Sequence, residues 1–191
     1  MSKIFIIRHG QDTDNAENIL NGHRDTELTD LGCEQARDMG NKLKNENIQV
    51  IYSSPLKRAQ KTASIVGGIL EIDKIVICDE LIERDFGILT GKPNSDISKY
   101  AGDIIVSDGV QYFTEADGAE SFSTLFERAK QVLEKITVNQ FNRNILIVTH
   151  GDMGKMLRAV FNDWTWEEGL KTPRFRHGDV IELCDKYLWN T

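Results

Sequence analysis

Short apolar runs alternate along the chain with segments whose apolar residues recur at helical spacing. The runs hold three to five residues with few polar positions, as expected of strands covered on both faces of a sheet. They predict strands at Ile4–Ile7, Ile48–Tyr52, Ile75–Ile77, Ile145–Val148 and Val180–Leu183. Strands that alternate with helices are typical of a mostly parallel sheet, because each parallel crossover needs a helix-sized connection.

The predicted helices each carry one apolar face. They are Thr29 to about Asn45, a helix that follows Ser54-Pro55 and stops at Gly67-Gly68, Phe122–Ile136, and Met153–Val160. Ser54 is interpreted as an N-cap and Pro55 as the first helical residue. We expect an α/β three-layer sandwich, with a mostly parallel central sheet and helices on both faces. Only residues 84–118 resist the pattern, so we expect one domain over 1–191 with an insertion or lid there.

Composition excludes several classes of protein. The 191 residues are 40% hydrophobic and 28% charged, which is not the composition of a disordered chain. A net charge of −7 argues against a general nucleic-acid binder. No apolar run approaches the roughly 20 residues that span a bilayer, and the start of the chain does not resemble a signal peptide. Cys33, Cys78 and Cys184 are too scattered for a disulfide framework, so we expect a reducing, cytoplasmic setting.

Two of the predicted strands end in a histidine followed by a glycine. The first strand continues as Arg8-His9-Gly10, and a later one continues as Thr149-His150-Gly151. Ligands bind in open parallel sheets at the carboxyl ends of the strands, so both histidines are expected at one edge. Structural hydrogen bonding is the alternative role for a strand-end histidine. His9 and His150 are two of only four histidines and follow strands in the same way, which favours a common functional site.

An arginine and a glutamate follow two further strands. Arg58 falls in the first turn of a predicted helix, and its side chain can lean back over the strand ends. The nearby Lys57 and Lys61 are interpreted as solvent-exposed. Glu83 follows the strand Ile75–Ile77 and lies at the same edge. A surface acid is the alternative for Glu83, but beside two histidines and an arginine it is a candidate proton donor.

This combination of residues is suited to phosphoryl chemistry. Arg8 and Arg58 can clamp a phosphate dianion, and neutral His9 can attack phosphorus. His150 can donate to a phosphate oxygen, and Glu83 can protonate the leaving group and later accept a proton from water. No cofactor is implied. The histidines lack zinc-ligand spacing, so no metal is predicted.

The chain resembles the histidine phosphatase superfamily, in its phosphoglycerate mutase-like branch. The matching residues are Arg8-His9-Gly10-Gln11-Asp12-Thr13-Asp14-Asn15, Gly22, Asp25, Leu28-Thr29, Gly32, Gln35-Ala36, Tyr52-Ser53-Ser54-Pro55-Leu56-Lys57-Arg58-Ala59, Thr62-Ala63, Glu83 through Gly87, and Thr149-His150-Gly151. The resemblance implies a phosphoglycerate mutase-like fold. It also implies that His9 is the nucleophile and Glu83 the proton donor. The phosphate- and substrate-binding residues that it implies are Arg8, Gln11, Asn15, Gly22, Arg58, His150 and Gly151.

The chain also departs from the family pattern. Asp12 stands where the family usually has Ser or Thr, and it would repel phosphate unless it pairs with a backbone donor or an arginine. Leu89-Thr90-Gly91 replaces the common Trp-Glu-Gly. His177 stands where relatives often have Asn, and it either lines the site or packs beside it. His23 contacts substrate or lies in a surface loop.

The sequence favours a phosphatase acting on small phosphomonoesters. The lid from Lys92 to Asp117 holds two lysines against five acidic residues, a balance of −3 that disfavours a strongly anionic substrate. The alternatives are a mutase dependent on 2,3-bisphosphoglycerate, which the segment Glu83 through Lys92 partly resembles, and a non-catalytic phospho-ligand-binding protein. We expect no nucleic-acid or membrane partner, and the sequence leaves a homodimer open. The apolar lid residues that either shape the pocket or only pack the lid are Tyr100, Ile104, Ile105, Val110, Tyr112 and Phe113.

Overall fold

The computed structural model describes residues 2–138 and 142–183 and contains a central five-stranded sheet. Its strands are β1 (Ile4–Arg8), β2 (Ile48–Ser53), β3 (Ile75–Ile77), β6 (Asn144–Thr149) and β7 (Val180–Leu183). The order is β3-β2-β6-β1-β7. The pairs β1·β6, β2·β6 and β2·β3 are parallel, and β7 runs antiparallel to β1. The predicted, mostly parallel sheet is therefore confirmed.

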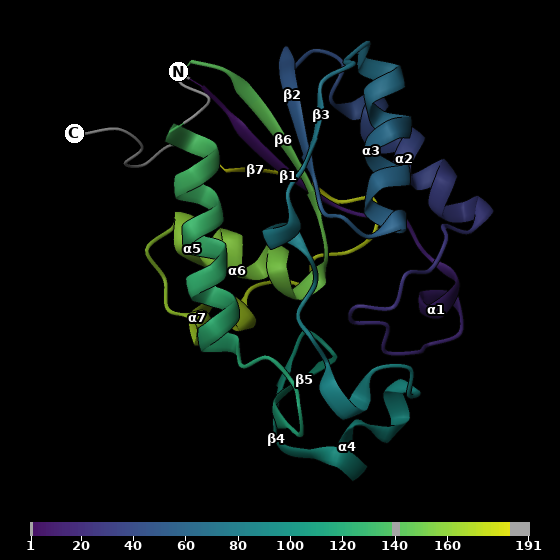
Figure 1. Ribbon diagram of the computed structural model, residues 1–191, viewed down its shortest axis with the longest axis vertical. Helices are drawn as coiled ribbons and strands as arrows, with labels where there is room; N and C mark the ends of the chain where they lie inside the picture. Colours follow the sequence, from purple (N-terminus) through teal and green to yellow (C-terminus); the bar gives the residue numbers. More distant parts are fainter. Residues whose placement is uncertain (1, 139–141, 184–191) are drawn as a thin grey trace.

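Helices cover both faces of this sheet (Figure 1). They are α2 (Asp30–Lys42) and α3 (Lys57–Leu70) on one face, and α5 (Phe122–Val138), α6 (Gly151–Phe161) and α7 (Trp166–Lys171) on the other. Alternate residues of β1 enter separate cores: Ile4 and Ile6 pack toward α5 and α6, whereas Phe5 and Ile7 pack toward α2 and α3. Burial on both faces explains why the strands have no polar alternation.

The start and end of α3 differ from the sequence prediction. Ser54 is not the N-cap and Pro55 is not the first helical residue, because the helix begins at Lys57 with Leu56 at its N-cap. Ser54 instead turns its hydroxyl toward His150. The helix also continues beyond Gly67-Gly68 to Leu70, and it ends where Glu71 adopts a left-handed conformation with φ of 56°. Glycine therefore does not end this helix, since both glycines keep helical backbone angles.

The segment expected to be a lid has its own secondary structure and a small core. It contains η2 (Gly87–Leu89), η3 (Asn94–Asp96), α4 (Ile97–Tyr100) and an antiparallel hairpin of β4 (Ala101–Ser107) and β5 (Val110–Ala116). Phe86, Leu89, Ile97 and Phe113 pack together in it, apart from the two main cores. The lid lies beyond the carboxyl ends of the central strands (Figure 1).

Other sequence expectations concern the thiols and the membrane. Cys33 and Cys78 are free thiols, and Cys184 lies outside the described residues. Within residues 2–138 and 142–183, no helix has the length and apolarity needed to cross a bilayer.

Backbone contact between the loop after β1 and the first turn of α2 fixes the position of His9. Gly10 and Gly32 face each other so closely that a methyl group on either would overlap a backbone carbonyl oxygen. The backbone N–H of Thr29 also donates to the carbonyl of Gln11 over 3.0 Å. Two glycines are therefore needed here for a close approach of backbone to backbone.

We expect Gly32→Ala to lower the free energy of unfolding by about 1–3 kcal/mol, because the added methyl overlaps the Gln11 carbonyl. The same displacement should move His9 and reduce turnover. Gly68→Ala in α3 is the matched control, since its methyl meets nothing within 4 Å. That control should be stabilised by about 0.5–1 kcal/mol. Urea unfolding of both variants tests this, and a Gly32→Ala protein of unchanged stability would contradict it.

Candidate active site

His9 lies at the end of β1 with its imidazole fixed in one tautomer. Its Nδ1 lies 2.7 Å from the Gly10 carbonyl and must donate to it. Its Nε2 accepts a hydrogen bond of 3.2 Å from Nε of Arg58. Burial first, and then the charge of Arg58, hold the pKa of His9 well below its usual 6.5. The ring is therefore neutral, with its lone pair on Nε2.

Arg58 is fully buried beneath the site by its position in the first turn of α3. Its guanidinium donates to the carbonyls of Arg24 over 2.5 Å and Gly22 over 2.8 Å. Its Nε also lies 3.3 Å from Oδ2 of Asp12, which is equally buried. Asp12 caps the short helix α1 (Thr13–Ala16) by accepting from the N–H of Asn15. Asp12, which replaces the usual Ser or Thr of the family, thus pairs with an arginine and a backbone donor. This pairing is the arrangement under which the sequence analysis expected it not to repel phosphate.

Two hydrogen-bond donors near His9 have no partner among the described residues. The rings of His9 and His150 lie 5.0 Å apart. Nε2 of His150 lies 2.7 Å from the Ser54 hydroxyl. The Ser54 O–H has no other acceptor within the described residues, so it donates to the ring. The imidazole proton of His150 is then on Nδ1, which is buried and unpartnered. Nε of Arg8 is likewise buried and unpartnered. Such orphaned donors fit an anion, because buried polar groups are normally paired.

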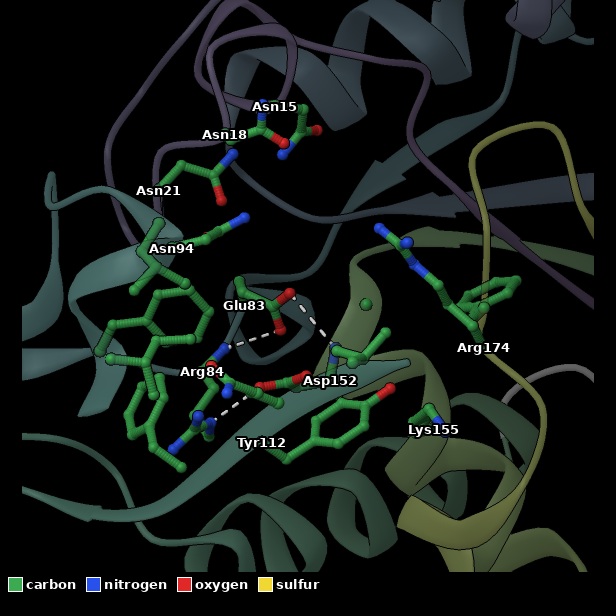
Figure 2. A pocket seen from close by; sticks show the side chains of 18 of the residues that line it. Asn15, Asn18, Asn21, Glu83, Arg84, Asn94, Tyr112, Asp152, Lys155 and Arg174 are labelled. Carbon is green, nitrogen blue, oxygen red and sulfur yellow. Dashed lines mark hydrogen bonds and ion pairs between the residues drawn. The ribbon is translucent and has the colours of Figure 1, made fainter. Parts of the chain in front are cut away.

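Glu83 is buried and held by backbone N–H groups at the start of α6. It accepts from Arg84 over 2.9 Å, from Met153 over 3.1 Å and from Asp152 over 3.3 Å (Figure 2). Burial first, and then the neighbouring Asp152 carboxylate, raise the pKa of Glu83. A carboxyl with a raised pKa keeps its proton closer to neutral pH, which suits a general acid.

Sequence reasoning missed the side chains that support Glu83. Arg84 is buried and donates to Oδ2 of Asp152 over 2.8 Å. Its guanidinium is stacked between the rings of Phe113 and Phe122, at 3.9 and 4.2 Å from their centroids. Arg84 therefore joins the lid core to α5 directly beside the acid. The position of Arg84 directly after the predicted acid Glu83 was the signal in the sequence that could have indicated this support.

The backbone carbonyl of Glu83 is held from two sides. His23 Nε2 lies 2.7 Å from it, and Arg128 of α5 donates to it over 3.3 Å. Arg128 also donates to the carbonyls of Glu80 and Ile82, so one side chain fixes the whole turn before the acid. His23 is therefore a support for Glu83, and it does not line the cavity described next.

A cavity of about 620 Å³ opens between the strand ends, the lid and the segment after α7. Of the residues predicted to bind substrate, Arg8, Gln11, Asn15 and Gly151 line it together with Glu83. His9, Arg58 and His150 lie at 1, 0 and 0% exposure, below its surface. Gly22 does not line it, because its carbonyl is turned to Arg58. Gly22 therefore holds Arg58 through its carbonyl and, contrary to the substrate-binding role expected of it, does not line the cavity.

The expectation that the lid presents negative charge to the substrate is wrong. Between Lys92 and Asp117, the residues that line the cavity are Asn94, Ile97, Val106, Gly109, Val110, Gln111, Tyr112 and Phe113, all uncharged. Asp96 is paired with Lys99, and none of the five acidic residues faces the cavity. Tyr112 and Phe113 both pack into apolar cores and line the cavity, so the two roles proposed for the apolar lid residues coincide there.

His177 lies in the segment that closes the site after α7. Its Nδ1 donates to the backbone carbonyl of His9 over 2.8 Å, and its ring lies 5.3 Å from that of His9. Burial lowers the pKa of His177 to about 3, so the ring is neutral. It lines the cavity. In the same segment the carbonyl of Phe175 accepts from Nη1 of Arg8 over 3.0 Å. This segment therefore positions two of the predicted site residues.

No group of three or more His, Cys, Asp or Glu side chains within the described ranges is arranged to hold a metal ion. The geometry is that of a neutral histidine, with a lone pair on Nε2, beside cationic and unpartnered donors. A family model, that of the histidine phosphatase superfamily (branch 1), matches residues 4–183. The chain belongs to this superfamily. The match covers every residue of the histidine phosphatase site described above.

Several relatives of this chain have names that indicate an activity. It is 33% identical over 191 residues to a 2,3-bisphosphoglycerate-dependent phosphoglycerate mutase of Parvibaculum lavamentivorans, covering 96% of this chain and 91% of that protein. It is 31% identical to a metal-independent phosphoserine phosphatase of Arabidopsis thaliana, covering 84% and 68%. A phosphoserine phosphatase of Entamoeba histolytica, solved with 3-phosphoglyceric acid, matches with a TM-score of 0.78 and 27% identity over 95% and 90% of the two chains. The named relatives thus include both phosphatases and mutases.

We expect Asp12→Asn to tighten phosphate binding and to weaken the fold. Removing the carboxylate leaves Arg58 buried without its anion, which costs about 3–5 kcal/mol of stability. The same change releases the charge of Arg58 from its carboxylate partner, so more of that charge acts on a bound phosphate and the Ki of inorganic phosphate should fall roughly three- to tenfold.

Asp14→Asn is the control for this prediction. Asp14 is also buried, but it is paired with Arg24 at 2.7 Å. Its loss should lower the melting temperature without the gain in phosphate affinity. Inhibition of p-nitrophenyl phosphate hydrolysis and thermal unfolding measure the two effects, and an unchanged or higher Ki in Asp12→Asn would contradict the expected gain in phosphate affinity.

Proposed function

We propose that this protein is a phosphatase that hydrolyses small phosphomonoesters through a phosphohistidine intermediate on His9. The observation that carries the proposal is the lone pair on His9 Nε2 beside two buried, unpartnered donors, Nε of Arg8 and Nδ1 of His150. A phosphate dianion would satisfy both donors and bring phosphorus to the nucleophile. A protein that only binds phospho-ligands has no need for the acid Glu83 at the same place.

The first half-reaction transfers the phosphoryl group to the enzyme. Nε2 of His9 attacks phosphorus, the bond from phosphorus to the ester oxygen breaks, and Glu83 gives its proton to that oxygen. Arg58 donates to Nε2 in the resting structure. A phosphate oxygen accepts this N–H in its place, so substrate binding itself frees the lone pair. The imidazole Nδ1–H stays on the Gly10 carbonyl throughout.

The second half-reaction releases phosphate. The Glu83 carboxylate takes a proton from water as the water oxygen attacks phosphorus, and the bond from phosphorus to Nε2 breaks. The products are inorganic phosphate, protonated Glu83 and neutral His9. Arg8, Arg58 and His150 balance the charge of the phosphoryl oxygens in both steps.

The cations around the cavity favour the phosphatase over the mutase. A bisphosphorylated ligand needs strong cationic contacts away from the reacting phosphate. Of the four cations that line the cavity, Arg8 is assigned to the reacting phosphate, Arg84 is bound to Asp152, and Lys155 donates to the carbonyls of Leu170 and Thr172. Arg174 alone is then left for a second phosphate. Similarity to a mutase supports the second candidate. Monophosphoglycerate interconversion that depends on 2,3-bisphosphoglycerate and outpaces phosphate release would assign that second function.

Rapid quench with a labelled phosphomonoester tests the proposed intermediate. We expect alkali-stable label in the wild type and none in His9→Ala, because only His9 provides the nucleophilic nitrogen. His150→Asn is the matched control: it lacks the second histidine, 5.0 Å away, and should still become labelled, though slowly. Label and turnover should also survive EDTA. Label in His9→Ala, or loss of activity on chelation that a divalent ion restores, would overturn the mechanism.

We expect Glu83→Gln to slow hydrolysis of alkyl phosphates by roughly 10²–10⁴-fold. The loss should be smaller for p-nitrophenyl phosphate, whose leaving group needs less protonation. In the wild type, kcat/KM for an alkyl phosphate should fall as pH rises through the raised pKa of Glu83, because the carboxylate cannot donate a proton. Glu83→Gln should lack that alkaline limb.

Glu80→Gln is the control for the pH profile. Glu80 lies three residues earlier and is paired with Lys135 at 2.6 Å. This pairing holds the pKa of Glu80 at about 2, so it does not titrate near neutral pH. Its substitution should leave the alkaline limb in place. A limb that persists in Glu83→Gln would assign proton donation to another group.

A further inference from the structure

Arg174 is a cation without a partner at the wall of the substrate cavity. It follows α7, is exposed, and lines the cavity opposite a group of asparagines (Figure 2). No hydrogen bond or ion pair of its guanidinium is found within the part of the chain that the structure describes. The mechanism proposed above does not use it.

The backbone around Arg174 is fixed to the catalytic site and to the lid. The N–H of Arg174 donates to Oδ2 of Asp108 in the hairpin turn over 2.9 Å. The next residue, Phe175, accepts from Arg8, and Lys155 Nζ donates to the carbonyl of Thr172 over 2.7 Å. A side chain with these anchors on either side is positioned to contact the organic part of a substrate whose phosphate is on Arg8.

The cations that line the cavity outnumber the anions, and Arg174 is the cation whose charge is not paired among the described residues. Four cationic and two anionic side chains line it, although the whole chain carries a net charge of −7. The carboxylate of Glu83 is occupied by three backbone N–H groups, and Asp152 is paired with Arg84. Lys155 is occupied by backbone carbonyls. With Arg8 assigned to phosphate, Arg174 is the cation left for a second anion.

The opposite wall is polar and uncharged. The asparagines there are Asn15, Asn18, Asn21 and Asn94 (Figure 2). Asn21 is bound to Asp12, whereas Oδ1 of Asn15 is buried without a partner. Amides hydrogen-bond to hydroxyl or amino groups and do not offset a full negative charge. The cavity is therefore asymmetric, with one free positive charge facing neutral hydrogen-bonding groups.

We propose that Arg174 forms a carboxylate subsite, so that the preferred substrates are phosphomonoesters carrying a carboxylate within a few bonds of the phosphorylated oxygen. A guanidinium pairs with one carboxylate through two parallel N–H···O bonds. A second phosphate dianion would need more than this one free cation. The proposal rests on the phosphatase function above and names its substrate class.

Matched substrate pairs test the subsite. Phosphoserine and phosphoethanolamine differ only by the carboxylate, as do 3-phosphoglycerate and 2-hydroxyethyl phosphate. The wild type should prefer the carboxylated member of each pair. Arg174→Gln should lower kcat/KM for the carboxylated members by roughly 10–100-fold, the usual size of a hydrogen-bonded charge contact, mainly through KM. The same variant should change the decarboxylated members and p-nitrophenyl phosphate by less than about twofold.

Arg176→Gln is the matched control, because Arg176 is an exposed arginine two residues away that does not line the cavity. It removes the same charge and should keep the wild-type preference. Arg174→Lys should retain part of the preference, since it keeps the charge and loses the planar fork. An equal loss on both members of a pair, or a preference that persists in Arg174→Gln, would refute the subsite while leaving the phosphatase function intact.

Binding measurements separate failure of this inference from failure of the proposed function. If no phosphomonoester is hydrolysed, the phosphatase proposal fails. Calorimetric titration of wild type and Arg174→Gln with phosphoserine and phosphoethanolamine then still decides the subsite. Tighter binding of phosphoserine that is lost in Arg174→Gln supports it. Equal affinities in the two proteins refute it.

Discussion

The parallel pairing of β1 with β6 is the constraint on which the site depends. The two strands pair with Arg8 opposite Thr149, so the residues that follow, His9 and His150, leave the sheet side by side. The N–H of His9 donates to the Thr149 carbonyl over 3.0 Å, which extends the ladder to the nucleophile itself. A shift of one residue in this register would turn one histidine toward the opposite face. The edge between them is where α3 and the segment after α7 supply their arginines.

The sequence was informative wherever burial imposed a simple pattern. The strands were predictable because helices cover both faces, so that nearly every position in Ile4–Ile7 and Ile145–Val148 is apolar. The meeting of His9, His150, Arg58 and Glu83 was predictable from topology, since parallel strands end at one edge. Their exact partners were not: the Ser54 hydroxyl and the Phe175 carbonyl are contacts across the fold that no local pattern marks.

The lid shows why other features could not be predicted. The register of its hairpin shifts on both sides of Asp103, so the period-two alternation is lost. Its net charge was correctly counted from the sequence, but a sum does not record position, and the acidic residues do not line the cavity. Arg174 was overlooked for a related reason, because an isolated arginine in a loop looks the same in sequence whether it faces solvent or a substrate.

The stacking of Arg84 between Phe113 and Phe122 has a consequence for the dynamics of the protein. The same residue provides a backbone N–H to Glu83 and a side-chain partner to Asp152. The lid core, α5 and the loop of the acid thus share one buried cation, and we expect them to unfold locally as one cooperative unit. A thermal fluctuation that melts the lid core disorders the proton donor with it. We therefore expect open molecules to be inactive, and amide hydrogen exchange in β5 and around Glu83 to proceed through one common opening.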